Sequence, residues 1–263
     1  FTGALTITTN DNSGMDADAT IDGGTTNLII GTSTIDGDLT LLSGGTITDT
    51  NSSTVTVKGD LSATTDANSS DITLNDLAVS GQIQLDTVIV SNEDTAQAGS
   101  TGTTITLASG ASTTDDFYNS MSVYISDDTG SGQVRAISDY VGSTRVATVA
   151  TWTTTPDATS VYEVRSSFGD ATVVNATDIK FAASTVGGNL TATATIGDVT
   201  QSGALNIAGI STITASDSGA DVILFNPLND FVGAVSTTGH DVKLWDTNAI
   251  DLGAATVAGV YTV

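Results

Sequence analysis

A short phrase that opens with Gly recurs at a fixed step near the C-terminal end of the chain, and this repeat limits the possible folds more than any other feature. The phrases are GADVILFN from residue 219, GHDVKLWD from residue 239 and GVYTV from residue 259, a step of 20 residues. Apolar and polar residues alternate within them, and the inward positions are Val242, Leu244, Val260 (or Tyr261) and Val263. Alternation with a period of two predicts β-strands. Strands at equal steps of about 20 residues predict stacked coils, because one coil cannot bury its apolar face alone. A β-sandwich with evenly spaced strands is the alternative.

Related phrases occupy most of the remaining chain. GALTI, GDLTLL, GDLSA and GQIQL begin at residues 3, 37, 59 and 81, and VGGNLTATA and SGALNIAG begin at residues 186 and 202. Second strands fit between them, with Gly, Asn or Asp at the corners, where these residues tolerate turn conformations. The sequence therefore predicts one solenoid part over residues 1–85 and another over residues 169–263.

Residues 86–168 interrupt this pattern. They show no echo at 20 residues, and they hold all three arginines, Arg135, Arg145 and Arg165, and seven of the 13 aromatic residues. Strands are expected to begin near residues 103, 122, 132, 145 and 160, and one helical turn at residues 114–119. This change of composition predicts a separate small β domain with its own aromatic core, inserted into the solenoid.

The charge balance excludes several classes of partner. Lys and Arg number 6 against 30 Asp and Glu, a formal net charge of −24. Nucleic acid and anionic membrane surfaces are therefore not expected as partners, since both need a basic surface. No apolar run is long enough to span a bilayer, so membrane insertion is not expected. The chain has no cysteine, which excludes disulfide and thiolate chemistry. The first residue is Phe1, which suggests a removed signal peptide or an excerpt of a longer chain.

Paired carboxylates are the only candidates for a metal site. The pairs are Asp16 with Asp18, Asp36 with Asp38, Asp115 with Asp116 and Asp127 with Asp128, of which the last two pairs are the candidates for Ca²⁺; no other cofactor is expected. Ca²⁺ needs six to eight converging oxygens, and none of these pairs matches an EF-hand loop or a Gly-rich nonapeptide repeat, so solvated turns are the favoured interpretation. The one histidine, His240, excludes His-based triads and multi-histidine metal sites within this chain and is expected at a solvent-facing corner.

Two resemblances add to this interpretation. The segments STVGGNLTATATIGDVTQSGALNIAG, NDFVGAVSTTGHDVKLWDTNAIDLGAATVAGVYTV and, more weakly, STIDGDLTLLSGGTIT resemble filamentous-haemagglutinin-like β-solenoid repeats of large bacterial surface and secreted proteins. That resemblance implies an elongated right-handed β-helix that serves as a stalk, filament or adhesin, and it supplies no catalytic residues. Residues 103–126, 130–152 and 156–164 resemble a small β module of phage tail and virion proteins that also occurs as an insertion in bacterial surface proteins.

Together these features predict an all-β protein, a β-solenoid interrupted by a small inserted β domain, with a structural or adhesive function outside the cell or at its surface. The alternative functions are a phage tail or fibre component that binds a host surface and, third, a carbohydrate-active enzyme. A polysaccharide lyase is disfavoured, because the solenoid parts have no Arg and only Lys58, Lys180 and Lys243. The expected partner is the chain itself, as a head-to-tail homopolymer or as neighbouring coils of a longer chain, with surface glycans as a further partner. In this assembly the strand near Leu5 and Ile7 pairs with a strand like that of Val260 and Val263.

Overall fold

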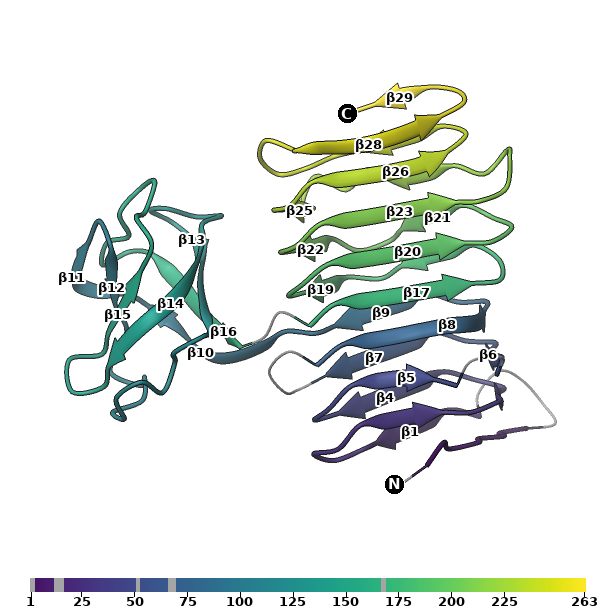
Figure 1. The fold of residues 1–263 in the computed structure, drawn as a ribbon, viewed down its shortest axis with the longest axis horizontal. Helices are drawn as coiled ribbons and strands as arrows, with labels where there is room; N and C mark the ends of the chain where they lie inside the picture. Colours follow the sequence, from purple (N-terminus) through teal and green to yellow (C-terminus); the bar gives the residue numbers. More distant parts are fainter. Residues whose placement is uncertain (1–2, 12–16, 51–52, 66–69, 167–168) are drawn as a thin grey trace. The chain divides into compact units, whose positions relative to one another are not determined.

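The computed structural model describes residues 3–11, 17–50, 53–65, 70–166 and 169–263, and it divides the chain into two compact units (Figure 1). Unit 1 comprises Phe1–Val88 and Phe168–Val263, and unit 2 comprises Ile89–Ser167. The described residues form strands and turns, which confirms the all-β class. None of them belongs to a helix with the length and apolarity that a membrane crossing requires. The helical turn expected at residues 114–119 is wrong: this stretch forms turns, with a φ of 62° at Asp116.

Unit 1 is a parallel β-solenoid whose first sheet runs along its whole length (Figure 1). Its described strands form one path of neighbours: β1 (Ala19–Asp22), β4 (Leu39–Ser43), β7 (Leu61–Thr65), β9 (Ile83–Asp86), β18 (Ile179–Phe181), β21 (Val199–Gln201), β24 (Val222–Leu224), β27 (Val242–Leu244) and β29 (Tyr261–Thr262). Three shorter strands extend the same sheet: β19 (Ser184–Val186), β22 (Leu205–Ile207) and β25 (Asp230–Phe231).

A second sheet faces the first across the core of the solenoid. Its path is β2 (Leu28–Ile30), β5 (Ile47–Asp49), β8 (Ile72–Val79), β17 (Ala171–Asn175), β20 (Leu190–Ala194), β23 (Ser211–Ala215), β26 (Val235–Gly239) and β28 (Leu252–Val257), with β3 (Ser33–Ile35) and β6 (Val55–Val57) beside it. Every pairing described within the two sheets is parallel, as stacked coils require.

The register stacks like residues on like residues. Leu39 pairs with Leu61, which pairs in turn with Ile83, and Val222 pairs with Val242. Inward positions are buried and the residues between them are more exposed, as the alternation predicted for Val242 and Leu244. The resulting cluster is built from Leu, Ile, Val and Ala, with Phe181 and Phe231 as its aromatic members. Small branched side chains therefore fill a narrow coil at every level.

Unit 2 is an antiparallel sheet with a different core. Its seven described strands follow the order β10 (Ile89–Thr95), β16 (Val161–Ser166), β13 (Ser122–Asp127), β14 (Val134–Val141), β15 (Val146–Val149), β12 (Thr104–Thr106) and β11 (Gln97–Thr101). The separate buried cluster of this unit includes Tyr118, Tyr140, Trp152 and Tyr162, which confirms the expected aromatic core. Strands β10 and β11 were not among those expected from the sequence.

The solenoid continues across the insertion without losing a layer. Strand β8 before it pairs in parallel with β17 after it, and β9 pairs with β18 and β19. At the junction the buried hydroxyl of Thr87 donates to the Gly169 carbonyl at 2.7 Å and accepts from the Gly187 N–H at 2.9 Å. The first unit boundary lies at Val88, three residues beyond the predicted one.

Candidate functional site

A column of aspartates runs along the corner of the solenoid just before the strands of the first sheet. Each carboxylate Oδ1 accepts the backbone N–H of the equivalent residue in the next coil. Asp18 accepts from Asp38 at 2.8 Å, Asp38 from Asp60 at 2.7 Å, and Asp60 from Gln82 at 2.7 Å. The column therefore links coil to coil through side chains in addition to the strand pairing.

The same arrangement returns after the insertion. Asp178 accepts from Asp198, Asp198 from Asp221, and Asp221 from Asp241, each at 2.8 Å, and Asp241 accepts from Val260 at 2.7 Å. We call these seven residues the Asp ladder: Asp18, Asp38, Asp60, Asp178, Asp198, Asp221 and Asp241. At the corner before the second sheet, Asn27, Asp71, Asp170 and Asn189 accept in the same way.

Glycine precedes three of the seven ladder residues, Asp38, Asp60 and Asp198, and at these three positions the preceding coil leaves no room for a side chain. A Cβ at Gly37, Gly59 or Gly197 would lie closer than 3 Å to the Oδ1 of the Asp in the coil before it. These three glycines do not have the positive φ that often requires glycine, so steric space is the reason for their presence. The recurring Gly-Asp dipeptide thus results from a close contact between neighbouring coils.

The electrostatics of the ladder favour the hydrogen bonds over repulsion between its members. Neighbouring coils are about 4.8 Å apart, and two unit charges at that distance repel by about 1 kcal/mol in water. A hydrogen bond to a charged group contributes about 1.5–3 kcal/mol. In the described part of the chain, the ion pairs of Lys58 with Asp36 and of Arg165 with Glu163 do not involve ladder residues. The basic side chain that lies near ladder carboxylates is His240.

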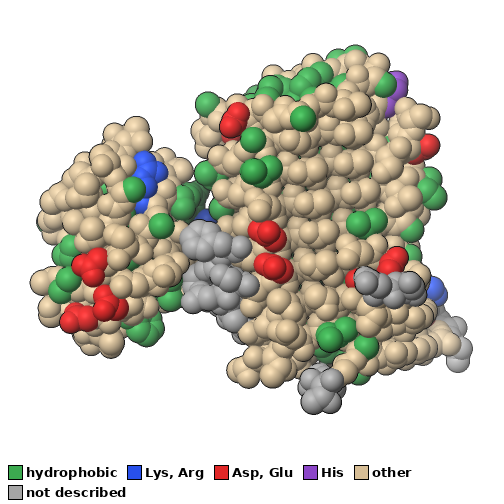
Figure 2. Space-filling model, in the orientation of Figure 1, with side chains coloured by type: hydrophobic (Ala, Val, Ile, Leu, Met, Phe, Trp, Pro, Cys, Tyr) green, Lys and Arg blue, Asp and Glu red, His purple; other side chains and the backbone are tan. Residues whose placement is uncertain are grey.

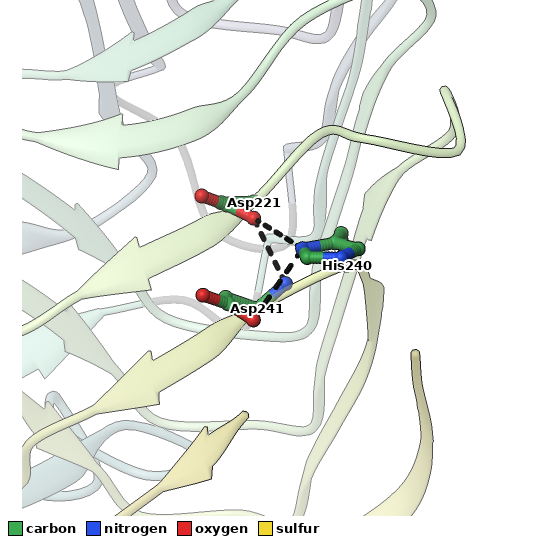
Figure 3. A group of neighbouring side chains, drawn as sticks. All are labelled: Asp221, His240 and Asp241. Carbon is green, nitrogen blue, oxygen red and sulfur yellow. Dashed lines mark hydrogen bonds and ion pairs between the residues drawn. The ribbon is translucent and has the colours of Figure 1, made fainter. Parts of the chain in front are cut away.

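His240 lies against two ladder carboxylates (Figure 3). Its Nδ1 is 3.5 Å from Asp221 Oδ1 and 3.4 Å from Asp241 Oδ1, and its side chain is 46% exposed. The three atoms that could bind a metal ion, His240 Nδ1 and one carboxylate oxygen each of Asp221 and Asp241, lie within 4.8 Å of one another. Among the described residues, this is the one cluster of at least three His, Asp or Glu side chains that could hold a metal ion. The expected solvent-facing corner position of His240 is correct, but its two carboxylate neighbours come from adjacent coils and were not foreseen.

The carboxylate pairs considered for Ca²⁺ lie in two exposed turns of unit 2. Asp115 accepts from the Gly142 N–H at 2.9 Å, and Asp116 accepts from the Asn119 side-chain amide at 2.8 Å. Asp127 accepts from the N–H of Asp128 at 2.8 Å. None of the four belongs to the three-membered group above. Turn formation accounts for the observed hydrogen bonds, and Ca²⁺ binding stays a prediction.

The residues predicted to mediate assembly lie in the first and last described coils. Leu5 bridges in parallel to Ile30, and Ile7 packs against the solenoid core. Tyr261, the alternative to Val260 in the predicted pattern, pairs with Val242 and so occupies the inward register. Val260 instead lies next to the last ladder residue, Asp241, which accepts its N–H. The carbonyl of Val260 accepts from the Val242 N–H at 2.8 Å. Val260 and Val263 are 58% and 57% exposed.

Two further features were not predicted from the sequence. Phe225 and Trp245, from adjacent coils, form an exposed edge-to-face pair with ring centroids 5.0 Å apart. Asp49 is buried: its Oδ2 accepts from the N–H groups of Asn75 and Asp76, while its Oδ1 has no partner. Desolvation raises the pKa of Asp49, and the two backbone hydrogen bonds partly oppose that rise. Neither the aromatic pairing nor the burial of Asp49 has a local sequence signal, because both depend on which residues adjacent coils bring together.

Comparison with known proteins assigns the chain to a family of repeats. No curated protein and no solved structure matches this chain. The family described as "Repeats of unknown function (DUF5649)" matches residues 16–85 and 169–238, which lie in the two halves of the solenoid on either side of unit 2. These segments make up more than half of the sequence, so the chain belongs to the family of DUF5649 repeats.

Proposed function

We propose that this chain is a structural and adhesive segment of an extracellular filament or stalk at the cell surface, in which coils stack end to end and no reaction is catalysed. The observation that carries the proposal is the Asp ladder. Its Oδ1 atoms accept backbone N–H groups of the next coil, so each carboxylate joins two neighbouring coils. A column that repeats the same contact from coil to coil suits a long and regular structure such as a filament or stalk.

The composition of the surface supports a role outside the cell. The face of the solenoid shown in Figure 2 is mostly neutral polar side chains and backbone, with isolated carboxylates. With a net charge of −24, copies of the chain repel one another at a distance, which favours their dispersal in solution.

The last described coil presents an apolar edge suited to end-to-end stacking. Strand β28 is mostly exposed, and Leu252, Tyr261, Val260 and Val263 have exposed side chains. The ladder stops at Val260, whose side chain has no acceptor for a further N–H. A coil that covers this edge, from a second copy or from a longer chain, therefore buries apolar surface and pairs the free strand edges of β28 and β29.

For the adhesive part, we propose surface glycans as the partner. The exposed Phe225–Trp245 pair presents apolar ring faces beside a hollow that the Asn226 amide also lines; the Gln201 amide in this hollow is already bonded to Gly203 and Asn229. Aromatic faces pack on the C–H faces of sugar rings, and amides bond to their hydroxyls.

Sedimentation velocity tests the stacking. The chain should associate reversibly as its concentration rises, and Val260→Lys with Val263→Lys should make it monomeric, since two charges cannot be buried at the contact. Thr247→Lys, in an exposed turn, is the control for added charge. A wild-type chain that is monomeric at every concentration overturns end-to-end stacking by this edge.

Location needs a separate measurement. Immunogold microscopy of intact source cells with antibodies against unit 2 should label extended structures outside the cell. Label confined to the cell interior contradicts the extracellular role.

A further inference from the structure

His240 directly precedes the ladder residue Asp241, at a position that other coils fill with smaller residues. The residue before the ladder Asp is Gly at positions 37, 59 and 197, Ala at positions 17 and 220, and Thr at position 177. Ala220 and His240 are direct equivalents, because the His240 N–H donates to the Ala220 carbonyl at 2.6 Å. One coil thus carries an imidazole where the other coils carry Gly, Ala or Thr, and this imidazole lies against two carboxylates (Figure 3).

The separations of these groups fit a metal ion better than a hydrogen bond. The Nδ1–Oδ1 distances of 3.5 and 3.4 Å are at or beyond the usual limit for a hydrogen bond between nitrogen and oxygen. They equal the edge of a tetrahedron around an ion with bonds of about 2.0–2.2 Å, which is about 3.3–3.6 Å. The three ligating atoms lie within 4.8 Å of one another, so a small rotation of the partly exposed carboxylates brings both oxygens onto one ion.

Binding an ion does not require the ladder to break. Each Oδ1 has two lone pairs, of which one accepts the N–H of Asp241 or Val260. In the described structure, Asp221 Oδ2 and Asp241 Oδ2 accept no hydrogen bond and remain available as alternative ligand atoms. The uncompensated negative charge of the ladder further favours a cation at this place.

We propose that Asp221, His240 and Asp241 form a binding site for one divalent transition-metal ion of the Zn²⁺ class, which ties two neighbouring coils together. Imidazole with carboxylate suits Zn²⁺, whereas Ca²⁺ selects oxygen ligands in larger number. Three protein ligands leave one position for water. Because the ligands come from successive coils, the ion binds the folded stack and stabilises it against unfolding.

The presence of a single histidine allows a direct test on the wild-type chain. With histidine labelled isotopically, the imidazole signals in the NMR spectrum belong to His240 alone. Zn²⁺ should shift them with saturation at one equivalent, and Ca²⁺ at the same concentration should not. The melting temperature of the whole chain should rise with Zn²⁺. Imidazole signals that do not respond to Zn²⁺ overturn the site.

Matched variants separate this site from the rest of the ladder. Losing an outer partner of a metal site weakens binding about 10–100-fold, so His240→Ala should raise the Zn²⁺ dissociation constant at least about 100-fold. Asp221→Asn should also weaken binding while keeping the ladder, because Asn189 naturally accepts the N–H of the next coil. Asp198→Asn makes the same change one coil away and should leave the affinity unchanged. Equal Zn²⁺ affinity in wild type and His240→Ala, or equal loss in Asp198→Asn and Asp221→Asn, overturns the proposal.

Discussion

The solenoid and the inserted unit both contain glycine at turns, and two different physical reasons account for it. At Gly37, Gly59 and Gly197 the backbone avoids positive φ, and a side chain is excluded because the neighbouring coil fills the space. In unit 2, Gly132 has a φ of +84° and nothing within 4 Å of where its Cβ would lie. Asp116, Ser120, Asp128 and Arg145 in the same unit also have positive φ. Contacts between coils thus explain these three solenoid glycines and local turn geometry explains Gly132. Neither reason is confined to one unit, since Gly24 in the solenoid has a φ of +63° and open space, and a Cβ at Gly142 in unit 2 would lie 2.4 Å from the Thr113 backbone.

The cores of the two units also differ. The solenoid repeats one thin aliphatic layer, so each layer depends on the two beside it. Unit 2 encloses a few large aromatic residues whose polar atoms are bonded internally: Tyr162 accepts from the Ala108 N–H and donates to Asn92, and Tyr140 donates to the Ser112 carbonyl. A defect in the solenoid should therefore spread along the stack, while a defect in a turn of unit 2 should stay local.

The largest expected effect is a charge in one solenoid layer. Leu244 is fully buried in β27, whereas Thr247 lies in an exposed turn of the same coil. Leu244→Asp should cost about 4 kcal/mol or more, because the carboxylate must stay charged in a poor solvent or bind a proton. Thr247→Asp should change stability by less than about 0.5 kcal/mol. Thermal melting compares the two, and similar melting temperatures would show that the inward register is wrong.

The next effect separates the two uses of glycine. Gly59→Ala pushes a Cβ against Asp38 Oδ1 and the Gly37 carbonyl, so overpacking and a weakened ladder bond together should cost about 3 kcal/mol. Gly132→Ala meets no atom and should cost only about 1–2 kcal/mol, from the positive φ. Urea unfolding measures both. The comparison between the units fails if Gly132→Ala is the more damaging change.

Much of the solenoid could be predicted, because alternation and equal steps are local signals that each coil repeats. The inward positions Val242 and Leu244 follow from alternation alone. The function of the Gly-Asp dipeptide could not be predicted in the same way, since its reason lies in the coil before it, about 20 residues away. A search for polar residues that recur at the repeat step could have found the Asp ladder and placed His240 beside it.

Unit 2 was less predictable for the opposite reason. Its strands pair antiparallel over long and unequal separations, and β10 pairs with β16 across most of the unit. The polar strand β10, with Asn92, Glu93 and Asp94 in sequence, has no apolar alternation that would mark it as a strand. Likewise, the acidic turn at residues 114–119 has the residues of a helix start, but Asp116 adopts a left-handed conformation and the helix does not form.

A smaller effect distinguishes the units by pH. Burial raises the pKa of Asp49 in the solenoid, so the folded state binds its proton more tightly than the unfolded chain. This contribution to stability is present below the unfolded pKa and is lost as pH rises through the folded value. Asp157 in unit 2 is opposite: hydrogen bonds from Thr159 lower its pKa, so its contribution is present above the unfolded pKa and is lost as pH falls through the folded value.

Asp49→Asn removes the contribution of Asp49 and leaves that of Asp246, a second solenoid carboxyl whose pKa burial raises. Its melting temperature relative to wild type should be more favourable at pH 7 than at pH 4, because only wild type then carries a buried charge with an unpartnered Oδ1. Asp157→Asn should show the reverse trend. A difference between Asp49→Asn and wild type that is the same at both pH values would show that Asp49 is not perturbed as described.

The smallest expected effect is removal of unit 2. The two units have separate hydrophobic clusters, and β8 already pairs with β17 across the insertion point. The ends to be joined are close, since the Thr87 hydroxyl donates to the Gly169 carbonyl at 2.7 Å. Val88 joined to Gly169 by a short Gly/Ser linker should therefore keep the β circular dichroism and melt within a few degrees of the solenoid transition of the full chain.

The shortened chain must keep Thr87, because the Thr87 hydroxyl also accepts from the Gly187 N–H. Thr87→Val in the shortened chain should therefore lower the melting temperature more than the deletion itself does. Loss of cooperative unfolding on deletion would instead mean that unit 2 is a layer of the stack and that the two regions are one folding unit.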